Sequence, residues 1–277
     1  MYHSWETILN CTWTDARSVF LSDLHLGWKF SNSFHVAGLL RQCSPKFLYL
    51  VGDTFEWLYR PTSSLDEQTK FFLATLSYLQ NNGTNIYFLP GNHDEVLAEE
   101  SCHQAWSVVS HIIHQCISGS RFLIVHGDIF DLHRGRESCS WKKLGRWVYP
   151  KLVQWGNILS RIGFSPNNKE LHWCTHWKMS SERAKNHMDE FQSYMMELAE
   201  VHDCDGVVCG HIHLPKAAQS NKHFYFNCGD WIEHRSFVFE CQHGNLFLVP
   251  DALNPTSNSN ARCEADPIEF THFKIAV

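Results

Sequence analysis

The chain has 277 residues, enough for one large domain or for a domain that carries an insertion. An apolar share of 44% and a charged share of 19% are ordinary for a globular protein and exclude wholesale disorder. The net charge of -6 argues against a generic nucleic-acid binder.

The lack of a recognisable targeting signal and the cysteine usage both predict a cytoplasmic protein. Residues 1–15 lack the basic start and apolar core of a signal peptide, and no apolar run is long enough to span a membrane. Eleven cysteines are scattered through apolar runs without a C-x-x-C pair. We therefore expect buried, reduced thiols in a cytoplasmic protein, and neither a disulfide framework nor a cysteine zinc site.

Strands and helices alternate in the first third of the chain. Apolar runs predict strands over 18–21, 46–51 and 85–89, and apolar residues at helical spacing predict helices over 33–42 and 65–79. Residues 54–59 form a turn or a short helix in this interpretation. The alternation predicts a layered α/β fold with a largely parallel sheet, in which ligands gather beyond the carboxyl ends of the strands.

The rest of the chain continues the pattern after an interruption. Strands are predicted over 108–113 and 121–125, joined across 118–119, and again over 206–209 after a helix over 181–201. Residues 223–227 and 235–240 are interpreted as the two strands of a hairpin, and 245–249 as a last strand. We expect one domain over 1–250, with a helical insertion over 131–187, and a flexible tail over 251–277.

The predicted insertion over 131–187 differs in charge from the rest of the chain. It carries 11 of the 23 Lys and Arg residues and four acidic residues, a balance of +7, which leaves -13 for the remainder; five of the eleven Trp residues also lie here. One interpretation is a helical pair that packs on the core with its lysines in water. The other is a cap beside an active site, with basic residues for phosphate and an apolar groove for an acyl or aromatic group.

Five polar blocks each follow an apolar run, and they suggest a metal centre. The candidate ligands in them are Asp23, His25, Asp53, Asn92, His126, His211 and His213. Carboxylate, amide and imidazole groups suit Mn²⁺, Fe²⁺ or Zn²⁺ better than Ca²⁺, and the choice among these ions stays open. Seven groups are too many for one ion but can hold two if one carboxylate bridges. Such a pair activates a shared water and clamps both oxygens of a phosphoryl transfer.

The ordered blocks D-x-H, G-D, G-N-H-D, H and G-H-x-H resemble the calcineurin-like metallophosphoesterases over residues 19–239. The resemblance implies a four-layer α/β/β/α sandwich. It implies that Asp23, His25 and His213 hold one ion, that Asn92, His126 and His211 hold the other, and that Asp53 bridges them.

The same resemblance assigns a second role beside the metal ligands. His93 would face the substrate, stabilising the transferring phosphoryl group or protonating the leaving oxygen. Glu56 would orient His93. The alternative for Glu56 is a solvent-facing helix residue, because Glu is normally exposed.

Within the family, residues 50–57 and the insertion after His126 resemble the UDP-2,3-diacylglucosamine diphosphatases of lipid A biosynthesis, which hydrolyse a pyrophosphate to UMP and a lipid phosphate. Contact with the inner membrane surface would then be needed, and the basic, Trp-rich insertion could provide it. The candidate substrate contacts are Arg134, Arg136, Trp141, Lys142 and Arg146. The segment N-C-G-D-W over 227–231 is similar to a group of uncharacterised homologues.

One departure keeps other functions open. The lipid A enzymes usually read G-N-R-D in the third block, where this chain has His93. A phosphoesterase of the same fold that acts on a nucleotide, a phosphoprotein or a small phosphodiester or monoester is the first alternative. The second is a catalytically inactive scaffold, like the retromer subunit of this superfamily. Retention of all seven ligands argues against the scaffold, since an unpaired polar cluster is costly to keep.

Overall fold

The computed structural model describes residues 11–28, 31–56, 66–94, 106–133, 182–220 and 223–252. Most of the predicted insertion and nearly all of the predicted tail lie outside these ranges. The proposed substrate contacts outside the described residues are Arg134, Arg136, Trp141, Lys142 and Arg146.

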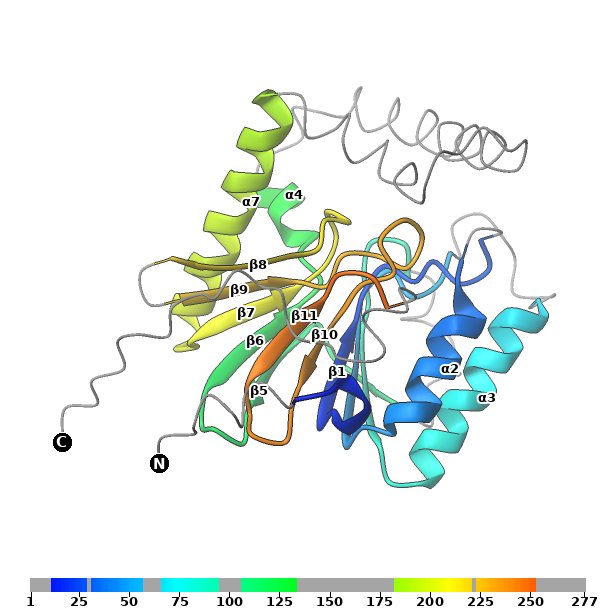
Figure 1. Cartoon of the computed structure of the whole chain (residues 1–277). Coiled ribbons are helices and arrows are strands. Elements are labelled where there is room, and N and C mark those ends of the chain that lie inside the picture. Colours follow the sequence, from blue (N-terminus) through cyan, green and yellow to red (C-terminus); the bar gives the residue numbers. More distant parts are fainter. Residues whose placement is uncertain are drawn as a thin grey trace, which may run out of the picture.

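Two mixed β-sheets form the centre of the protein (Figure 1). The six-stranded sheet has the order β11-β10-β1-β2-β3-β4, and its strands are β1 (Ser18–Leu21), β2 (Phe47–Val51), β3 (Asn85–Leu89), β4 (Ser107–Val108), β10 (Phe237–Glu240) and β11 (Leu246–Val249). The five-stranded sheet has the order β5-β6-β7-β9-β8, and its strands are β5 (His111–Gln115), β6 (Arg121–Val125), β7 (Gly206–Cys209), β8 (Lys216–Ser220) and β9 (His223–Asn227). Strands β1 to β4 pair in parallel, as do β6, β7 and β9.

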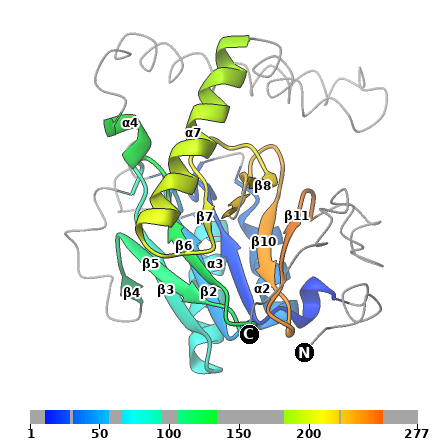
Figure 2. The same cartoon turned by 90° about the vertical axis from the view of Figure 1, so that its left-hand side faces the viewer.

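Helices cover the outer faces of the two sheets, as Figures 1 and 2 show. Helices α2 (Ser33–Cys43) and α3 (Glu67–Asn81) pack on the six-stranded sheet, and α7 (Glu182–Val201) packs on the five-stranded sheet. The short helices are η1 (Trp13–Asp15) and α4 (Ile129–His133). Apolar residues such as Phe20, Ile124 and Val208 fill the space between the sheets. The predicted α/β/β/α sandwich is therefore confirmed.

The helices begin and end close to their predicted bounds because their ends carry local signals. The side chain of Asp66 caps α3 by accepting the backbone N–H of Thr69 at 2.7 Å. Helix α2 ends at Cys43 and is capped by Ser44, whose backbone adopts the left-handed conformation. None of the helices that the structure describes is long and apolar enough to cross a membrane.

Strand pairing differs from the sequence-based expectation in three places. The predicted strand over 108–113 is two strands, β4 and β5, which belong to different sheets. The sequence shows a single apolar run there because Val109, next to β4, and Ile112, in β5, pack against the same core between the sheets. The predicted hairpin of β9 and β10 is wrong as well, since the connection crosses from one sheet to the other. Edge strand β8 was missed because its sequence, KAAQS, has no alternation of apolar and polar residues.

The cysteine prediction agrees with the described part of the chain. Seven cysteines lie there, all free and all buried. Burial raises the pKa of the Cys43 thiol to about 12, so this thiol stays protonated at neutral pH.

Candidate metal centre

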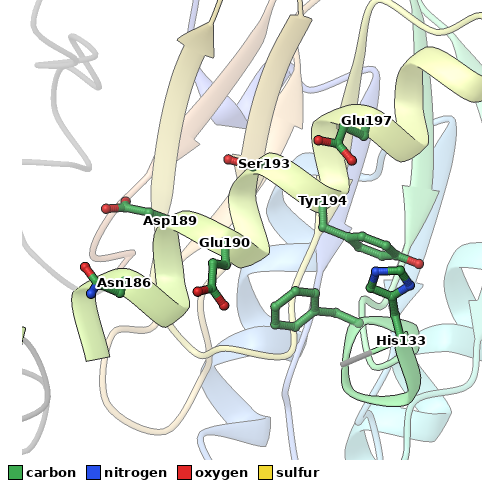
Figure 3. Close-up of a pocket in the computed structure, with 8 residues that line it drawn as sticks. His133, Asn186, Asp189, Glu190, Ser193, Tyr194 and Glu197 are labelled. Atoms are coloured by element: carbon green, nitrogen blue, oxygen red, sulfur yellow. The ribbon is translucent and has the colours of Figure 1, made fainter. Parts of the chain in front are cut away.

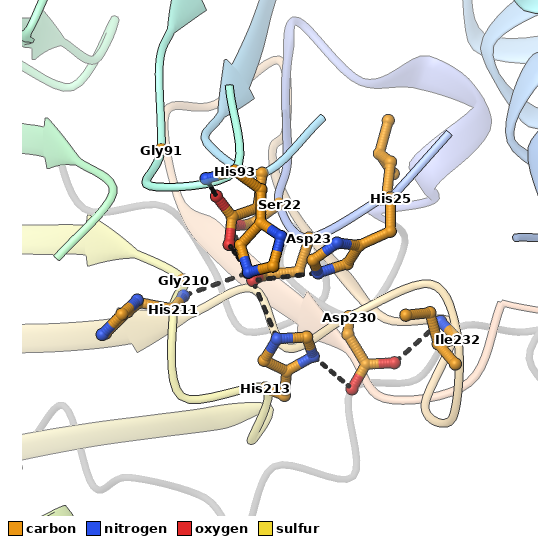
Figure 4. A network of polar contacts seen from close by, with 12 residues as sticks. Ser22, Asp23, His25, Gly91, His93, Gly210, His211, His213, Asp230 and Ile232 are labelled. Atoms are coloured by element: carbon orange, nitrogen blue, oxygen red, sulfur yellow. Dashed lines mark hydrogen bonds and ion pairs between the residues drawn. The ribbon is translucent and has the colours of Figure 1, made fainter. Parts of the chain in front are cut away.

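The predicted ligands lie at the carboxyl ends of strands from both sheets. Asp23 follows β1 and Asp53 follows β2, whereas His126 follows β6 and the G-H-x-H block follows β7. Backbone hydrogen bonds join these loops: the N–H of Asp23 donates to Gly52 at 3.0 Å, and the N–H of Gly210 donates to His126 at 3.0 Å. The sandwich therefore brings together residues that are far apart in the sequence (Figure 4).

The backbone at the site is strained. Five of the seven candidate ligands have positive φ angles: Asp23 at 54°, His25 at 44°, Asp53 at 49°, His211 at 71° and His213 at 58°. Residues other than glycine rarely adopt this conformation, and it costs roughly 1 to 3 kcal/mol at each position. Strain of this kind gathers at functional sites, where the surrounding structure holds it.

Two glycines of the blocks are required by close packing. A Cβ atom on Gly52 would collide with the ring of His126, and one on Gly210 would collide with the hydroxyl of Ser22. The glycines of G-D and G-H-x-H thus allow the two sheets' loops to approach each other.

Asp23, His25 and His213 form the first group of ligand atoms, all within 4.8 Å of one another. Asp23 Oδ1 lies 3.2 Å from His213 Nε2 and 3.9 Å from His25 Nε2. The other oxygen, Oδ2, accepts hydrogen bonds from the Ser22 hydroxyl at 2.6 Å and the His211 N–H at 3.0 Å. One oxygen of Asp23 is therefore anchored and the other faces the two imidazoles.

Hydrogen bonds at Nδ1 fix which ring nitrogen each histidine turns toward the centre. His126 Nδ1 donates to the Val51 carbonyl at 2.9 Å, and His25 Nδ1 donates to Glu56 Oε2 at 2.7 Å. In the neutral form of each ring, Nε2 is then the nitrogen that would bind a metal ion.

Asp53 lies between the two sets of predicted ligands. Its Oδ1 accepts the backbone N–H of His93 at 2.8 Å, and its Oδ2 lies 3.5 Å from His126 Nε2. Ligand atoms of Asp23, Asp53 and His126 lie within 4.8 Å of one another. Asp53 is therefore close to ligand atoms of both predicted sets.

Of the remaining predicted ligands, Asn92 follows β3 of the six-stranded sheet, whereas His126 and His211 follow strands of the five-stranded sheet. The rings of His126 and His211 are 5.2 Å apart at their centroids. His211 Nε2 lies 3.5 Å from Oδ2 of Asp131 in α4, a neighbour that the sequence analysis missed because no block marks it.

Glu56 joins His25 to His93. Its Oε1 lies 2.9 Å from His93 Nδ1, and its side chain is only 9% exposed. The alternative of a solvent-facing Glu56 is therefore wrong. The His93 ring remains 22% exposed, more than the His25 ring at 6%.

The carboxylates of the site give it a strong preference for positive charge. Burial alone would lower the pKa of His25, but its hydrogen bond to Glu56 and the charges of Asp53 and Asp23 outweigh burial and raise the pKa to about 9. The pKa of His126 is raised to about 10 against the effect of burial, chiefly by Asp53. Protons thus occupy imidazoles that a cation would otherwise bind.

Unpaired buried atoms identify where a cation would fit. Within the described ranges, the atoms of predicted ligands without a hydrogen-bond partner include Asp23 Oδ1, His25 Nε2, Asn92 Oδ1 and His126 Nε2. Buried polar atoms are normally paired, because an unpaired one costs about 1 to 3 kcal/mol. Oxygen and imidazole nitrogen donors that converge in this way fit divalent metal ions.

A groove lies between α4 and α7 (Figure 3). The residues that line it are Phe130, His133, Asn186, Asp189, Glu190, Ser193, Tyr194 and Glu197. Three of them are acidic, so the described walls of this groove disfavour a phosphate group.

Comparison with known proteins gives the chain a family. The family described as calcineurin-like phosphoesterase matches residues 16–215. The chain belongs to this family. The predicted family, fold class and metal-dependent hydrolase chemistry are thereby confirmed, and divalent metal ions are the cofactors that the family implies.

Several curated relatives carry one name, UDP-2,3-diacylglucosamine hydrolase. The protein from Psychromonas ingrahamii is 26% identical, and the match covers 86% of this chain and 98% of the relative. The proteins from Wigglesworthia glossinidia brevipalpis and Vibrio parahaemolyticus are 25% and 23% identical, with 80% of this chain covered in each case and 89% and 93% of the relative. The predicted resemblance to this group is confirmed.

Proposed function

We propose that the protein is a dinuclear-metal phosphoesterase that hydrolyses the pyrophosphate bond of UDP-2,3-diacylglucosamine to UMP and 2,3-diacylglucosamine 1-phosphate. The observation that carries the proposal is the convergence of predicted ligands whose buried atoms Asp23 Oδ1, His25 Nε2, Asn92 Oδ1 and His126 Nε2 lack hydrogen-bond partners among the described residues. The substrate is supported by matches that extend over nearly the full length of relatives with that printed name.

In this proposal the predicted ligands divide as the family pattern implies. Asp23, His25 and His213 hold one ion, and Asn92, His126 and His211 hold the second, with Asp53 between them. When bound, two divalent ions would lower the pKa of a water and polarise the phosphoryl oxygens. Mn²⁺ is our first choice of ion, with Fe²⁺ or Zn²⁺ as the alternatives.

His93 acts on the substrate side of the centre. Its Nδ1 is engaged by Glu56, so the ring presents Nε2 to the phosphoryl group or to the leaving oxygen. Glu56 holds two rings at once, because its second oxygen contacts His25 Nδ1. A hydrogen bond or a proton from Nε2 would stabilise the charge that develops on the departing phosphate.

The substrate is amphiphilic, so we further propose that the protein works in the cytoplasm at the inner membrane surface. The sequence over 131–187, with its balance of +7 and five Trp residues, supports such a contact. Its candidate contacts, Arg134, Arg136, Trp141, Lys142 and Arg146, belong to this proposal.

A second candidate is a phosphoesterase of the same family with a nucleotide or another small phosphodiester or monoester as substrate. His93 favours it, because the lipid A enzymes usually have Arg at this place. The inactive scaffold is disfavoured, because all seven predicted ligands are retained. In addition, the backbone of the site is strained, and several of its buried polar atoms lack hydrogen-bond partners among the described residues.

The test is hydrolysis of UDP-2,3-diacylglucosamine by Mn²⁺-loaded protein, with UMP measured by chromatography. We expect His93→Ala to lower the rate by about 10²- to 10⁴-fold. His202→Ala is the matched control, because His202 contacts His111 and is not a predicted site residue. Absence of UMP together with cleavage of bis-p-nitrophenyl phosphate would favour the second candidate. Absence of both activities would contradict the proposed chemistry.

A further inference from the structure

The turn between β9 and β10 carries an acidic residue that no ligand block contains. The segment Asn227-Cys228-Gly229-Asp230-Trp231 begins at the last residue of β9 and leads into this turn, which crosses from one sheet to the other. The backbone N–H of Trp231 donates to the carbonyl of Asp23 at 3.2 Å, so the turn is tied to the first ligand loop. Asp230 itself is 0% exposed. A fully buried carboxylate next to a metal centre requires specific partners.

The two oxygens of Asp230 have separate partners. Oδ1 accepts three successive backbone N–H groups, from Ile232 at 2.8 Å, Glu233 at 2.6 Å and His234 at 3.3 Å. Oδ2 lies 2.9 Å from His234 Nδ1 and 3.6 Å from His213 Nδ1. Because Oδ1 is held by the turn, the carboxylate is fixed in rotation and Oδ2 stays directed at the two imidazoles.

His213 therefore lies between two carboxylates, as Figure 4 shows. Its Nε2 is 3.2 Å from Asp23 Oδ1, and its Nδ1 is 3.6 Å from Asp230 Oδ2. A proton on Nδ1 faces an acceptor, whereas a proton on Nε2 would occupy the nitrogen that points to the predicted ligands. The same arrangement holds for His25, whose Nδ1 donates to Glu56.

We propose that Asp230 is a positioning residue for the metal centre, which holds His213 with its proton on Nδ1 and its Nε2 directed at the first ion. The proposal rests on the proposed dinuclear function. It extends that function by assigning a carboxylate–histidine–metal triad to the turn between β9 and β10. Oδ1 and the contact of Oδ2 with His234 brace the turn itself, so the contact between Oδ2 and His213 is a separate role.

Asp230→Asn separates these two roles. The three N–H groups of the turn hold the amide oxygen at the place of Oδ1, which puts the amide NH₂ at the place of Oδ2. This NH₂ group cannot accept a proton from Nδ1, so the tautomer with Nε2 protonated is favoured and the first ion loses its ligand. We expect about 10- to 100-fold weaker binding of one ion and unchanged binding of the other.

His234→Leu is the matched control. It removes the other imidazole from Asp230 Oδ2 but leaves the contact with His213. We expect this variant to bind both ions within about twofold of the wild type, with a lower melting temperature from the lost hydrogen bond.

The experiment is a titration of metal-free protein with Zn²⁺ by calorimetry, together with long-range ¹H–¹⁵N spectra of the His213 ring. Two ions per wild-type chain and a protonated Nδ1 in zinc-loaded wild type are expected. A proton on Nε2 of His213 in the zinc-loaded wild type would overturn the inference without any variant. Two ions bound by Asp230→Asn with wild-type affinity also overturn it. Fewer than two ions on the wild type would instead contradict the proposed dinuclear function.

Discussion

Two buried clusters of acidic and imidazole groups in the described part of the chain differ in how their polar atoms are paired. One is the metal centre. The other, here called the Glu240 cluster, consists of Arg17, Ser18, His114, Cys116 and Glu240. Ligand atoms of His114, Cys116 and Glu240 lie within 4.8 Å of one another, as do those of the first metal group. Composition and spacing alone would thus allow a cation in either place.

Pairing separates the two clusters. Both carboxylate oxygens of Glu240 accept hydrogen bonds, Oε1 from the Ile117 N–H at 2.9 Å and Oε2 from Arg17 at 2.8 Å. His114 uses both ring nitrogens, with Nδ1 2.8 Å from the Tyr49 hydroxyl and Nε2 3.0 Å from Glu240. At the metal centre, by contrast, atoms such as His25 Nε2 and Asn92 Oδ1 have no hydrogen-bond partner among the described residues. The metal centre is therefore distinguished from the structural hydrogen-bond network around Glu240 by its unfilled hydrogen-bonding capacity and not by its composition.

Removal of the bridging carboxylate should have the largest effect. We expect Asp53→Ala to lower phosphoesterase activity by at least about 10³-fold, since several kcal/mol of transition-state stabilisation depend on the ions it joins. Added Mn²⁺ should stabilise the wild type by about 2.7 kcal/mol at a hundred times its dissociation constant, and the variant much less. Calorimetric melting with and without Mn²⁺ checks this, and equal stabilisation of both proteins would count against the bridging role.

The opposite result is expected in the Glu240 cluster. Glu240→Gln should lower the free energy of unfolding by about 3 to 5 kcal/mol, because Arg17 and His114 lose a buried charged partner. Activity per folded molecule and metal content should not change. Denaturant unfolding and metal analysis measure the two effects. The control is Glu67→Gln, which removes an exposed pair with Lys70 and should cost less than about 1 kcal/mol.

Acid should weaken the same cluster in a defined range. Burial alone would raise the pKa of Glu240, but hydrogen bonds from His114, Ser18 and the Ile117 N–H lower it from 4.5 to about 2. Because the folded pKa lies below the unfolded one, the stabilisation is complete above about pH 4.5 and is lost as the pH falls toward 2. Between pH 5 and pH 2, the free energy of unfolding should fall less steeply with decreasing pH for Glu240→Gln than for the wild type. Identical slopes would exclude this contribution.

A smaller effect is expected at the edge of the metal centre. Glu56→Gln keeps the shape of the side chain but weakens its hold on the Nδ1 protons of His25 and His93. We expect a loss of activity of about 10- to 100-fold, with weaker binding of the ion that His25 holds. Steady-state rates at saturating and limiting Mn²⁺ separate the two contributions. Unchanged rates at both concentrations would leave Glu56 with a structural role only.

Much of the site could be predicted because its residues follow apolar runs directly. Strands such as β1 and β2 are buried along their full length or nearly so, and the polar residue that ends each run therefore marks the sheet's edge. The layer order followed from the family resemblance and from the alternation of strands and helices.

Other features depend on contacts that leave no local trace in the sequence. The turn that carries Asp230 is set by its crossing from β9 to β10, and the sequence suggested a hairpin there because both flanking strands are apolar and buried. The approach of Asp131 to His211 likewise depends on where α4 packs. Glu56 was expected beside His93, but its second contact with His25 appears only when the loops after β1 and β2 are joined.

The most direct test is anomalous diffraction from crystals soaked in Mn²⁺. We expect two peaks roughly 3.5 to 4 Å apart among Asp23, His25, Asp53, Asn92, His126, His211 and His213, the spacing of a two-metal centre. No peak is expected at His114, Cys116 and Glu240, where the hydrogen bonds of the described residues are already filled. A peak at the Glu240 cluster, or none at the predicted ligands, would contradict the assignment of the metal centre.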